Sequence, residues 1–224
     1  HSDGQSLSIE PLASGWFGMA FRVAGNWVMK ISHPQPPVEG FGNTPTQKGA
    51  IKAREHLQTM QNAADDAHLP FLVERGQDVV YVPGNDGYGD AIVTLQPHYD
   101  LLSARDIRSG EVPQNQLSRL DGELLRVIQF VHLIREKGLL PDFFSKKNLS
   151  IARFPTDDTD NPEYHFVLVD VGPVDGATAG PIAQLGMNTW IVGRLLQWGW
   201  RMGSIPRELL PRSDIPDRAT RFAS

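Results

Sequence analysis

Apolar side chains recur every three or four residues in several parts of the chain, which is the spacing that places them on one face of a helix. The clearest stripe predicts a helix over 114–137 and consists of Leu117, Leu120, Leu124, Val127, Val131 and Ile134. Gly138 follows directly, and glycine is a common residue just past the end of a helix. Weaker patterns predict helices over 47–67 and about 188–202, and a short helix over 101–110.

Short apolar runs bounded by Gly, Pro, Asn and Asp predict strands. Residues 7–32 fit a meander of strands with a turn at 24–26. The other expected strands are 71–74, 78–82, 91–97, 149–154 and 164–169, the last two as a hairpin. The strands expected up to residue 97 make the first hundred or so residues the β-rich part of the chain, which also contains the helix at 47–67.

The composition narrows the class of protein. Apolar residues make up 40% of the 224 positions and charged residues 21%, which fits a soluble globular protein. There is no cysteine, so disulfides, thiolate zinc sites and cysteine nucleophiles are excluded. The formal net charge is −5, no run is basic, and no apolar run approaches the ~18 residues of a membrane span. We therefore expect neither a nucleic-acid partner nor a membrane span.

An acidic residue ends one of the most apolar predicted strands. The run 165–169 leads into Asp170, and Gly172 follows two residues later. A carboxylate at the exit of a buried strand is costly unless a charged partner meets it there, and a divalent cation is such a partner. The ordinary alternative is a strand that turns into a loop, with Asp for the turn and Gly for positive φ.

A pair of glycines precedes a lysine in the first meander. Gly15 and Gly18 are three residues apart, which lets a hairpin tip bring backbone N–H groups close to a phosphate. Lys30 stands in the next apolar strand, where it would meet the same phosphate as a point charge. The ordinary alternative is a plain hairpin with a solvated lysine.

A polar loop follows the helix predicted at 114–137. It runs from Gly138 to Asn148, which opens the next strand, and it contains Asp142 and two lysines, Lys146 and Lys147. The ordinary alternative for this Asp is a surface turn residue.

Taken in their order along the chain, these three segments resemble the motifs of the protein-kinase fold, over about residues 8–200. Residues 13–20 stand where such kinases carry G-x-G-x-x-G-x-V, and 28–30 stand where they carry the Ala-x-Lys end of the third strand. The loop 138–148 resembles the catalytic loop, and Asp-Val-Gly at 170–172 resembles the family's Asp-Phe-Gly.

The resemblance implies a fold of the α+β class, a minimal two-lobed protein-kinase-like fold with a β-rich N-lobe over 1–97 and a helical C-lobe over 98–224. The chain looks like the trimmed bacterial kinase-like proteins, which include secreted effectors. It opens at His1 with no Met and no apolar signal segment, so we interpret its start as a tag remnant. We expect a cytoplasmic protein, in the producing cell or, for a secreted effector, in a host cell.

The resemblance also implies ATP and Mg²⁺ as cofactors. The backbone at Gly15 and Gly18 would cover the phosphates, and Lys30 would hold the α- and β-phosphates. Glu55 would pair with Lys30, although it lies roughly opposite the apolar stripe of its helix, and a solvated surface Glu is the alternative. The hinge strand would bring the backbone at Gln96 to the adenine.

The remaining implied roles concern phosphoryl transfer. Asn148 and Asp170 would bind Mg²⁺, Asp142 would orient the acceptor hydroxyl, and Lys146 or Lys147 would meet the γ-phosphate. The implied activity is that of a serine/threonine protein kinase acting on an unidentified protein substrate.

Several positions depart from the family pattern. Ala13 replaces the first loop glycine, there is no His-Arg-Asp, and Asp142 stands six residues before Asn148, where the family has five. Phe143 takes the usual place of the catalytic Asp, and no Ala-Pro-Glu segment precedes the last predicted helix. Two alternatives therefore stay open. One is a pseudokinase that serves as a nucleotide-binding or protein-interaction scaffold, and the other is a small-molecule kinase of the aminoglycoside or choline type.

Overall fold

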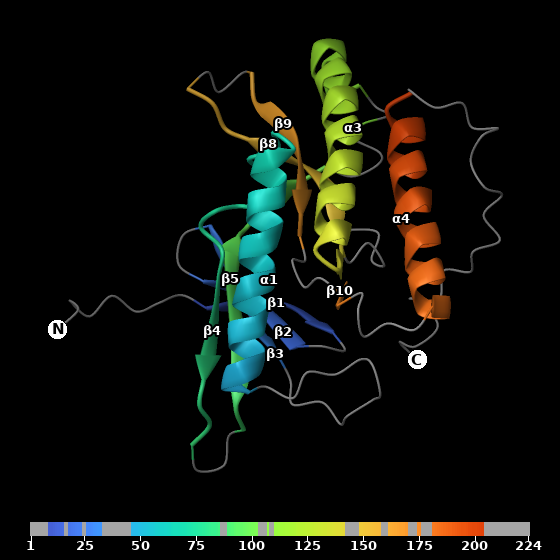
Figure 1. Cartoon of the computed structure of the whole chain (residues 1–224). Helices are drawn as coiled ribbons and strands as arrows, with labels where there is room; N and C mark the ends of the chain where they lie inside the picture. Colours follow the sequence, from blue (N-terminus) through green and yellow to red (C-terminus); the bar gives the residue numbers. More distant parts are fainter. Residues whose placement is uncertain are drawn as a thin grey trace, which may run out of the picture. The chain divides into compact units, whose positions relative to one another are not determined.

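The computed structural model (Figure 1) describes residues 9–15, 18–23, 26–32, 46–85, 89–102, 107, 110–141, 148–157, 161–169, 174–175 and 181–203. These residues form antiparallel β-sheets and three α-helices, so the chain belongs to the α+β class. None of the helices in the described ranges is both long and apolar enough to cross a membrane.

The chain divides into two compact units. Unit 1 comprises His1–Gln61 and Glu74–Tyr99, and unit 2 comprises Asn62–Val73 and Asp100–Ser224. Helix α1 (Gln47–Asp66) contributes residues to both. Asn62–Val73, which lies inside the range that the kinase resemblance assigned to an N-lobe, groups with unit 2.

Unit 1 is built on a five-stranded antiparallel sheet in the order β1-β2-β3-β5-β4. Its strands are β1 (Glu10–Gly15), β2 (Gly18–Val23), β3 (Trp27–Ser32), β4 (Asp78–Val82) and β5 (Ala91–Pro97). The first three confirm the predicted meander, and the other two confirm the strands predicted at 78–82 and 91–97. Strand β3 lies in the middle of the sheet, because it pairs with β2 on one side and with β5 on the other.

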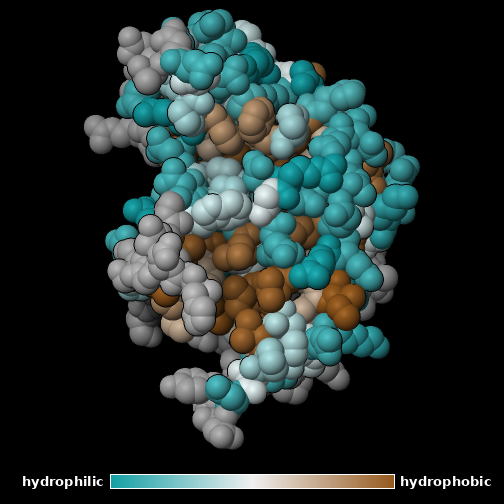
Figure 2. Space-filling view, turned by 90° about the vertical axis from the view of Figure 1, so that its left-hand side faces the viewer, coloured by the Kyte–Doolittle hydropathy of each residue, from teal (hydrophilic) through white to brown (hydrophobic). Residues whose placement is uncertain are grey.

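The two faces of this sheet differ in burial. Directly paired residues project to the same face, as do alternate residues of one strand, so the register places Val28, Val79 and Gln96 together. All three are buried. The opposite face keeps apolar side chains exposed, namely Met19, Trp27, Val80 and Val82. Figure 2, which shows the molecule from the side of β4, has hydrophobic side chains on the surface in its lower half.

Helix α1 starts at a capping residue and is joined to β4. The Thr46 hydroxyl oxygen accepts a hydrogen bond from the Gly49 N–H at 3.0 Å, which is the usual N-cap arrangement. The Arg54 side chain donates to the Asp78 carboxylate at 3.1 Å and to the Val79 carbonyl oxygen at 2.6 Å. The buried positions of the helix confirm the predicted apolar stripe and include Ala50, Leu57, Met60 and Ala64.

Unit 2 packs a β-hairpin against a long helix. Strands β8 (Leu149–Phe154) and β9 (Glu163–Leu168) form the predicted hairpin, and β6 (Asp100–Leu101) adds a third strand beside β8. Helix α3 (Gln114–Glu136) contacts β9 and confirms the helix predicted at 114–137. Gly138 follows it with φ 77°, the left-handed conformation that glycine adopts without strain.

Helix α4 (Pro181–Arg201) packs beside α3 (Figure 1). It begins at Pro181 rather than at the predicted 188. The indole N–H of Trp198 donates to the Leu149 carbonyl oxygen at 3.1 Å, and its ring meets Phe166 edge-on with centroids 5.6 Å apart. The Trp198 side chain therefore packs against the start of β8 and the middle of β9.

One prediction of secondary structure was wrong, and another is tested only in part. Residues 71–73 form a turn rather than a strand, in which the Leu72 N–H donates to the Leu69 carbonyl oxygen at 3.0 Å. Their apolar character reflects burial of the turn itself, since Leu72 and Val73 are both buried. In the range 101–110, which was predicted as a helix, Ile107 is helical, and residues 103–106, 108 and 109 lie outside the described residues. Leu101 lies in β6 instead, where it pairs with Ala152. The ladder with β8 takes precedence there over the local helical pattern.

Candidate functional site

The two predicted phosphate-loop glycines lie at the tip of the β1–β2 hairpin. Gly15 and Gly18 are paired across the ladder, and Gly18 also pairs with Ser32 of β3. A Cβ atom on residue 18 would collide with the carbonyl group of Ile31. Glycine is therefore required at position 18 by the close approach of β2 to β3, whatever else the hairpin tip binds.

Lys30 and Gln96 lie on the same face of the unit 1 sheet as Gly18. Lys30 pairs with Ala20 of β2 and with Thr94 of β5, and it is half-buried. Gln96 stands two residues beyond Thr94 on β5 and is only 2% exposed. The register thus brings three of the predicted nucleotide-binding residues to one face, the buried face of the sheet.

Glu55 lies on the exposed side of α1, as its position opposite the apolar stripe indicated. Within the part of the chain that the structure describes, no ion pair joins Glu55 to Lys30. The pairing that the kinase resemblance implied for Glu55 stays a prediction.

In unit 2, backbone hydrogen bonds connect the residues that flank the two predicted catalytic segments. Strand β7 (Leu139–Leu140) ends just before 142–147, and β10 (Val174–Asp175) begins just after 170–173. The two strands pair antiparallel, with Val174 opposite Leu140. On the other side of both segments, the Val169 N–H donates to the Asn148 carbonyl oxygen at 2.8 Å. Both ends of one segment are therefore tied to the ends of the other.

Asn148 is the one predicted metal ligand among the described residues, and it is buried at 7% exposure. Asp142, Lys146, Lys147 and Asp170 lie outside the described residues. In the ranges that the structure describes, no group of three or more His, Asp or Glu side chains could hold a metal ion.

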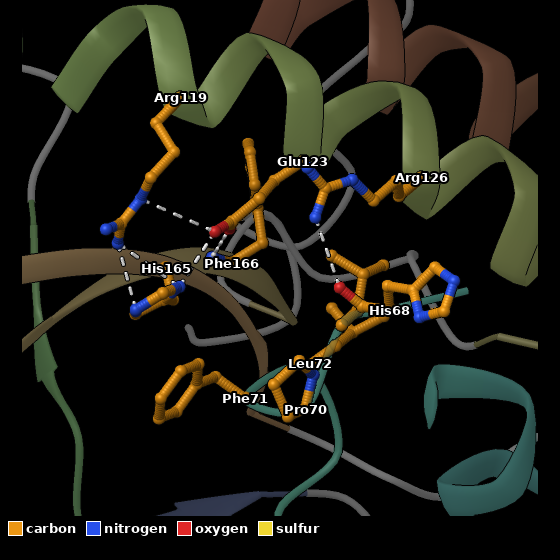
Figure 3. A pocket seen from close by; sticks show the side chains of 10 residues that line it. His68, Pro70, Phe71, Leu72, Arg119, Glu123, Arg126, His165 and Phe166 are labelled. Atoms are coloured by element: carbon orange, nitrogen blue, oxygen red, sulfur yellow. Dashed lines mark hydrogen bonds and ion pairs between the residues drawn. The ribbon is translucent and has the colours of Figure 1, made fainter. Parts of the chain in front are cut away.

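Sequence reasoning missed a buried polar cluster between α3 and β9 (Figure 3). Glu123 is only 5% exposed, and its carboxylate accepts the Phe166 N–H at 3.1 Å and His165 Nδ1–H at 2.7 Å. Nε2 of His165 lies 2.9 Å from Arg119 Nη2 and 3.3 Å from Glu163 Oε2. Glu123 stands at a core position of the α3 stripe, and a charged residue at such a position is the sequence signal that could have revealed the cluster.

The contact between His165 and Glu123 indicates where one proton of this cluster lies. Because a carboxylate only accepts, Nδ1 of His165 carries the proton shared with Glu123. The hydrogen bond from His165, with Arg119 nearby, lowers the pKa of the Glu163 carboxyl, and desolvation opposes this shift. Arg119 also donates to the Tyr164 carbonyl oxygen at 3.1 Å. The cluster thus joins α3 to β9 through both side chains and backbone. Phe166, the β9 residue that donates to Glu123, stands four residues before the predicted ligand Asp170.

Comparison with known proteins gives no family assignment: no protein-family model matches the chain, and a search of the curated proteins finds no match.

Proposed function

We propose that the chain is an ATP- and Mg²⁺-dependent phosphotransferase with a two-lobed, protein-kinase-like fold, which transfers the γ-phosphate to a hydroxyl group of a protein. The observation that carries this proposal is the hydrogen bond from Val169 to Asn148. It links Asn148 to the residue that precedes Asp170. The two proposed metal ligands therefore belong to chain segments that are hydrogen-bonded to each other at this point. Mg²⁺ is usually held by a few side-chain oxygens together with substrate phosphates and water.

The ladder between β7 and β10 supports the same proposal. It ties the chain before 142–147 to the chain after 170–173. A loop that carries an acceptor-orienting Asp and a segment that carries a metal-binding Asp must be held together for phosphoryl transfer, because this chemistry depends mostly on positioning and electrostatics.

Unit 1 would supply the nucleotide contacts from the buried face of its sheet. The hairpin-tip backbone at Gly18 would cover the phosphates, and Lys30 on the same face supplies a positive charge. The backbone at Gln96 would meet the adenine. Gly15, on the paired strand, completes the hairpin tip.

In the proposed reaction, the acceptor oxygen forms a bond to the γ-phosphorus as the bond to the bridging oxygen breaks and ADP leaves. The hydroxyl proton passes to Asp142, and Lys146 stabilises the transferred phosphate. Asn148 and Asp170 would hold Mg²⁺, which neutralises the charge that develops on the phosphate oxygens.

One observation favours the second candidate function, a pseudokinase scaffold that binds without transfer. Glu55 is exposed, and no ion pair with Lys30 is present among the described residues. In active protein kinases the corresponding Lys–Glu pair must be in place. A scaffold would keep nucleotide or partner binding while lacking transfer.

The experiment is incubation of the intact chain with ATP labelled at the γ-phosphate and Mg²⁺, alone and with a cell lysate. We expect label on a protein, its loss on chelation of Mg²⁺, and a decrease of about 10²–10⁴-fold in the Asp142→Asn variant. Asp157→Asn is the matched control, because Asp157 is exposed in the loop at the far end of the β8–β9 hairpin. Label on a small molecule would point to a metabolite kinase, and ATP binding with no transfer would point to the scaffold.

A further inference from the structure

A cavity in unit 2 involves none of the residues proposed for phosphoryl transfer. It has a volume of about 240 Å³ and lies between the turn at 68–72, helix α3 and strand β9 (Figure 3). Its apolar lining includes the buried side chains of Leu69, Leu72 and Phe166, with Phe71 half-buried beside them. The cavity therefore offers an apolar interior next to the charged face of α3.

One positive charge in the lining has no acidic partner. Glu123 is engaged by His165, and Arg119 is paired with Glu163 at 3.3 Å. Arg126 is exposed, and among the described residues no carboxylate pairs with it. The uncompensated charge of the lining is therefore the guanidinium of Arg126.

The guanidinium of Arg126 is held at the cavity by its surroundings. It donates to the carbonyl oxygen of His68 at 3.3 Å. Its Nη2 lies 3.8 Å from the point that a Cβ on Gly122 would occupy, so the side chain runs back over the preceding turn of α3. A charge fixed in this way loses little freedom on binding a ligand.

His68 adopts a backbone conformation that favours glycine. It has φ 56°, and it is the C′ residue of a Schellman motif: its N–H donates to the Asp65 carbonyl oxygen and the Leu69 N–H donates to Ala64, both at 2.8 Å. Its imidazole has no hydrogen-bond partner in the described part of the chain. The conformation of His68 ends α1 and directs its carbonyl oxygen to the guanidinium of Arg126.

The size and chemistry of the cavity define a ligand class. A cavity of about 150 Å³ with apolar walls is known to accept benzene, so 240 Å³ leaves room for one ring and a small polar group. It is smaller than the roughly 300–1,000 Å³ of sites for drug-sized ligands. A guanidinium favours a carboxylate, which it can bind with two parallel hydrogen bonds.

We propose that this cavity binds a small aromatic carboxylate, with the ring against Leu69, Phe71 and Phe166 and the carboxylate on Arg126. This site is independent of the proposed phosphoryl transfer, because none of its residues takes part in that reaction. Its test therefore needs no nucleotide.

The experiment is titration of the full-length, ¹⁵N-labelled chain with benzoate, followed by amide chemical shifts. We expect saturable shifts at 68–72 and 122–126 with roughly millimolar affinity, the range for a ligand of this size. Benzamide, which has the same shape without the charge, should bind more weakly. Arg126→Gln should lower the affinity for benzoate about fivefold, the effect of one exposed charge.

Arg135→Gln is the matched control, because Arg135 is an exposed arginine of the same helix outside the cavity. It should leave the affinity for benzoate within about twofold, since distant surface charges are screened. The amide spectrum of each variant reports directly whether it is folded. Equal binding of benzoate and benzamide, equal losses in the two arginine variants, or shifts confined to other residues would overturn the proposal. So would tighter binding of phenyl phosphate than of benzoate, which would assign the site to phosphate esters.

Discussion

The sheet of unit 1 and the α3–β9 region of unit 2 hold their polar residues in different ways. In unit 1 the backbone ladder alone sets which face Gly18, Lys30 and Gln96 occupy. In unit 2 a buried side chain, Glu123, accepts a backbone N–H of β9 and also orients His165. Removing Glu123 leaves a buried donor without a partner.

This difference concerns what places each polar group. The register of the ladder sets the face that Lys30 and Gln96 occupy. Polar groups in a buried network are already used, so the network stabilises one arrangement of α3 and β9. Substitutions with matched controls can test each side of the comparison.

The largest effect is expected for Glu123→Ala. It leaves the Phe166 N–H and His165 without their partner inside unit 2, and breaking a buried ionic network of this kind costs about 3–5 kcal/mol. The measurement is the free energy of unfolding in urea. The control is Glu136→Ala on the same helix, whose pair with His132 is exposed and should contribute no more than roughly 0.5 kcal/mol. Equal effects of the two variants would show that the buried network does not stabilise unit 2.

The next effect tests the ladder of unit 1. Gly18→Ala places a Cβ against the Ile31 carbonyl group, and overpacking of this kind costs about 1–3 kcal/mol. The same substitution at Gly193 in α4 meets no atom within 4 Å and should stabilise the chain by about 1 kcal/mol. The signs of the two changes in urea midpoint should therefore be opposite. A neutral Gly18→Ala would mean that β2 and β3 are not this close.

A smaller change is expected at the turn that follows α1. His68→Gly relieves the left-handed conformation and should stabilise unit 2 by about 0.5–1 kcal/mol, after allowance for the greater freedom of glycine in the unfolded chain. His132→Gly makes the same substitution within α3, where it should destabilise by about 0.5 kcal/mol. Thermal unfolding of both variants measures the two changes in stability. A loss of stability in His68→Gly would contradict the assigned backbone strain.

The smallest expected effect concerns the stability of the chain at acidic pH. The lowered pKa of Glu163 means that its contribution to stability is present above 4.5, the ordinary value for Glu, and is lost as the pH falls through the lower folded value. The side chain is 43% exposed, so solvent screens this contribution. Glu163→Gln should therefore flatten slightly the fall in stability below pH 4.5. Glu55→Gln, at an exposed position, should leave that part of the profile unchanged.

Periodic patterns account for the parts of the fold that sequence could predict. Alternation and turn residues located β1 to β5, the β8–β9 hairpin and the α3 stripe, because in these elements burial of one face determines the structure. The turn at 71–73 and strand β6 were missed because long-range contacts decide them. A charged residue at the core position of Glu123 signals a buried polar partner, but the identity of that partner and the cavity beside it could not be predicted, because they depend on which residue of β9 faces α3. The nucleotide and metal roles of Lys30, Asn148 and Asp170 came only from the kinase resemblance and stay predictions.

The most direct test of the central claim is calorimetric titration of the full-length chain with ATP, with Mg²⁺ and with chelator. We predict that the intact chain binds ATP and that Mg²⁺ strengthens binding. Asp170→Ala should lose this dependence on Mg²⁺, whereas Asp157→Ala, at the opposite end of the same hairpin, should keep it. No binding by the intact chain at millimolar ATP, or full Mg²⁺ dependence in Asp170→Ala, would contradict the proposed site.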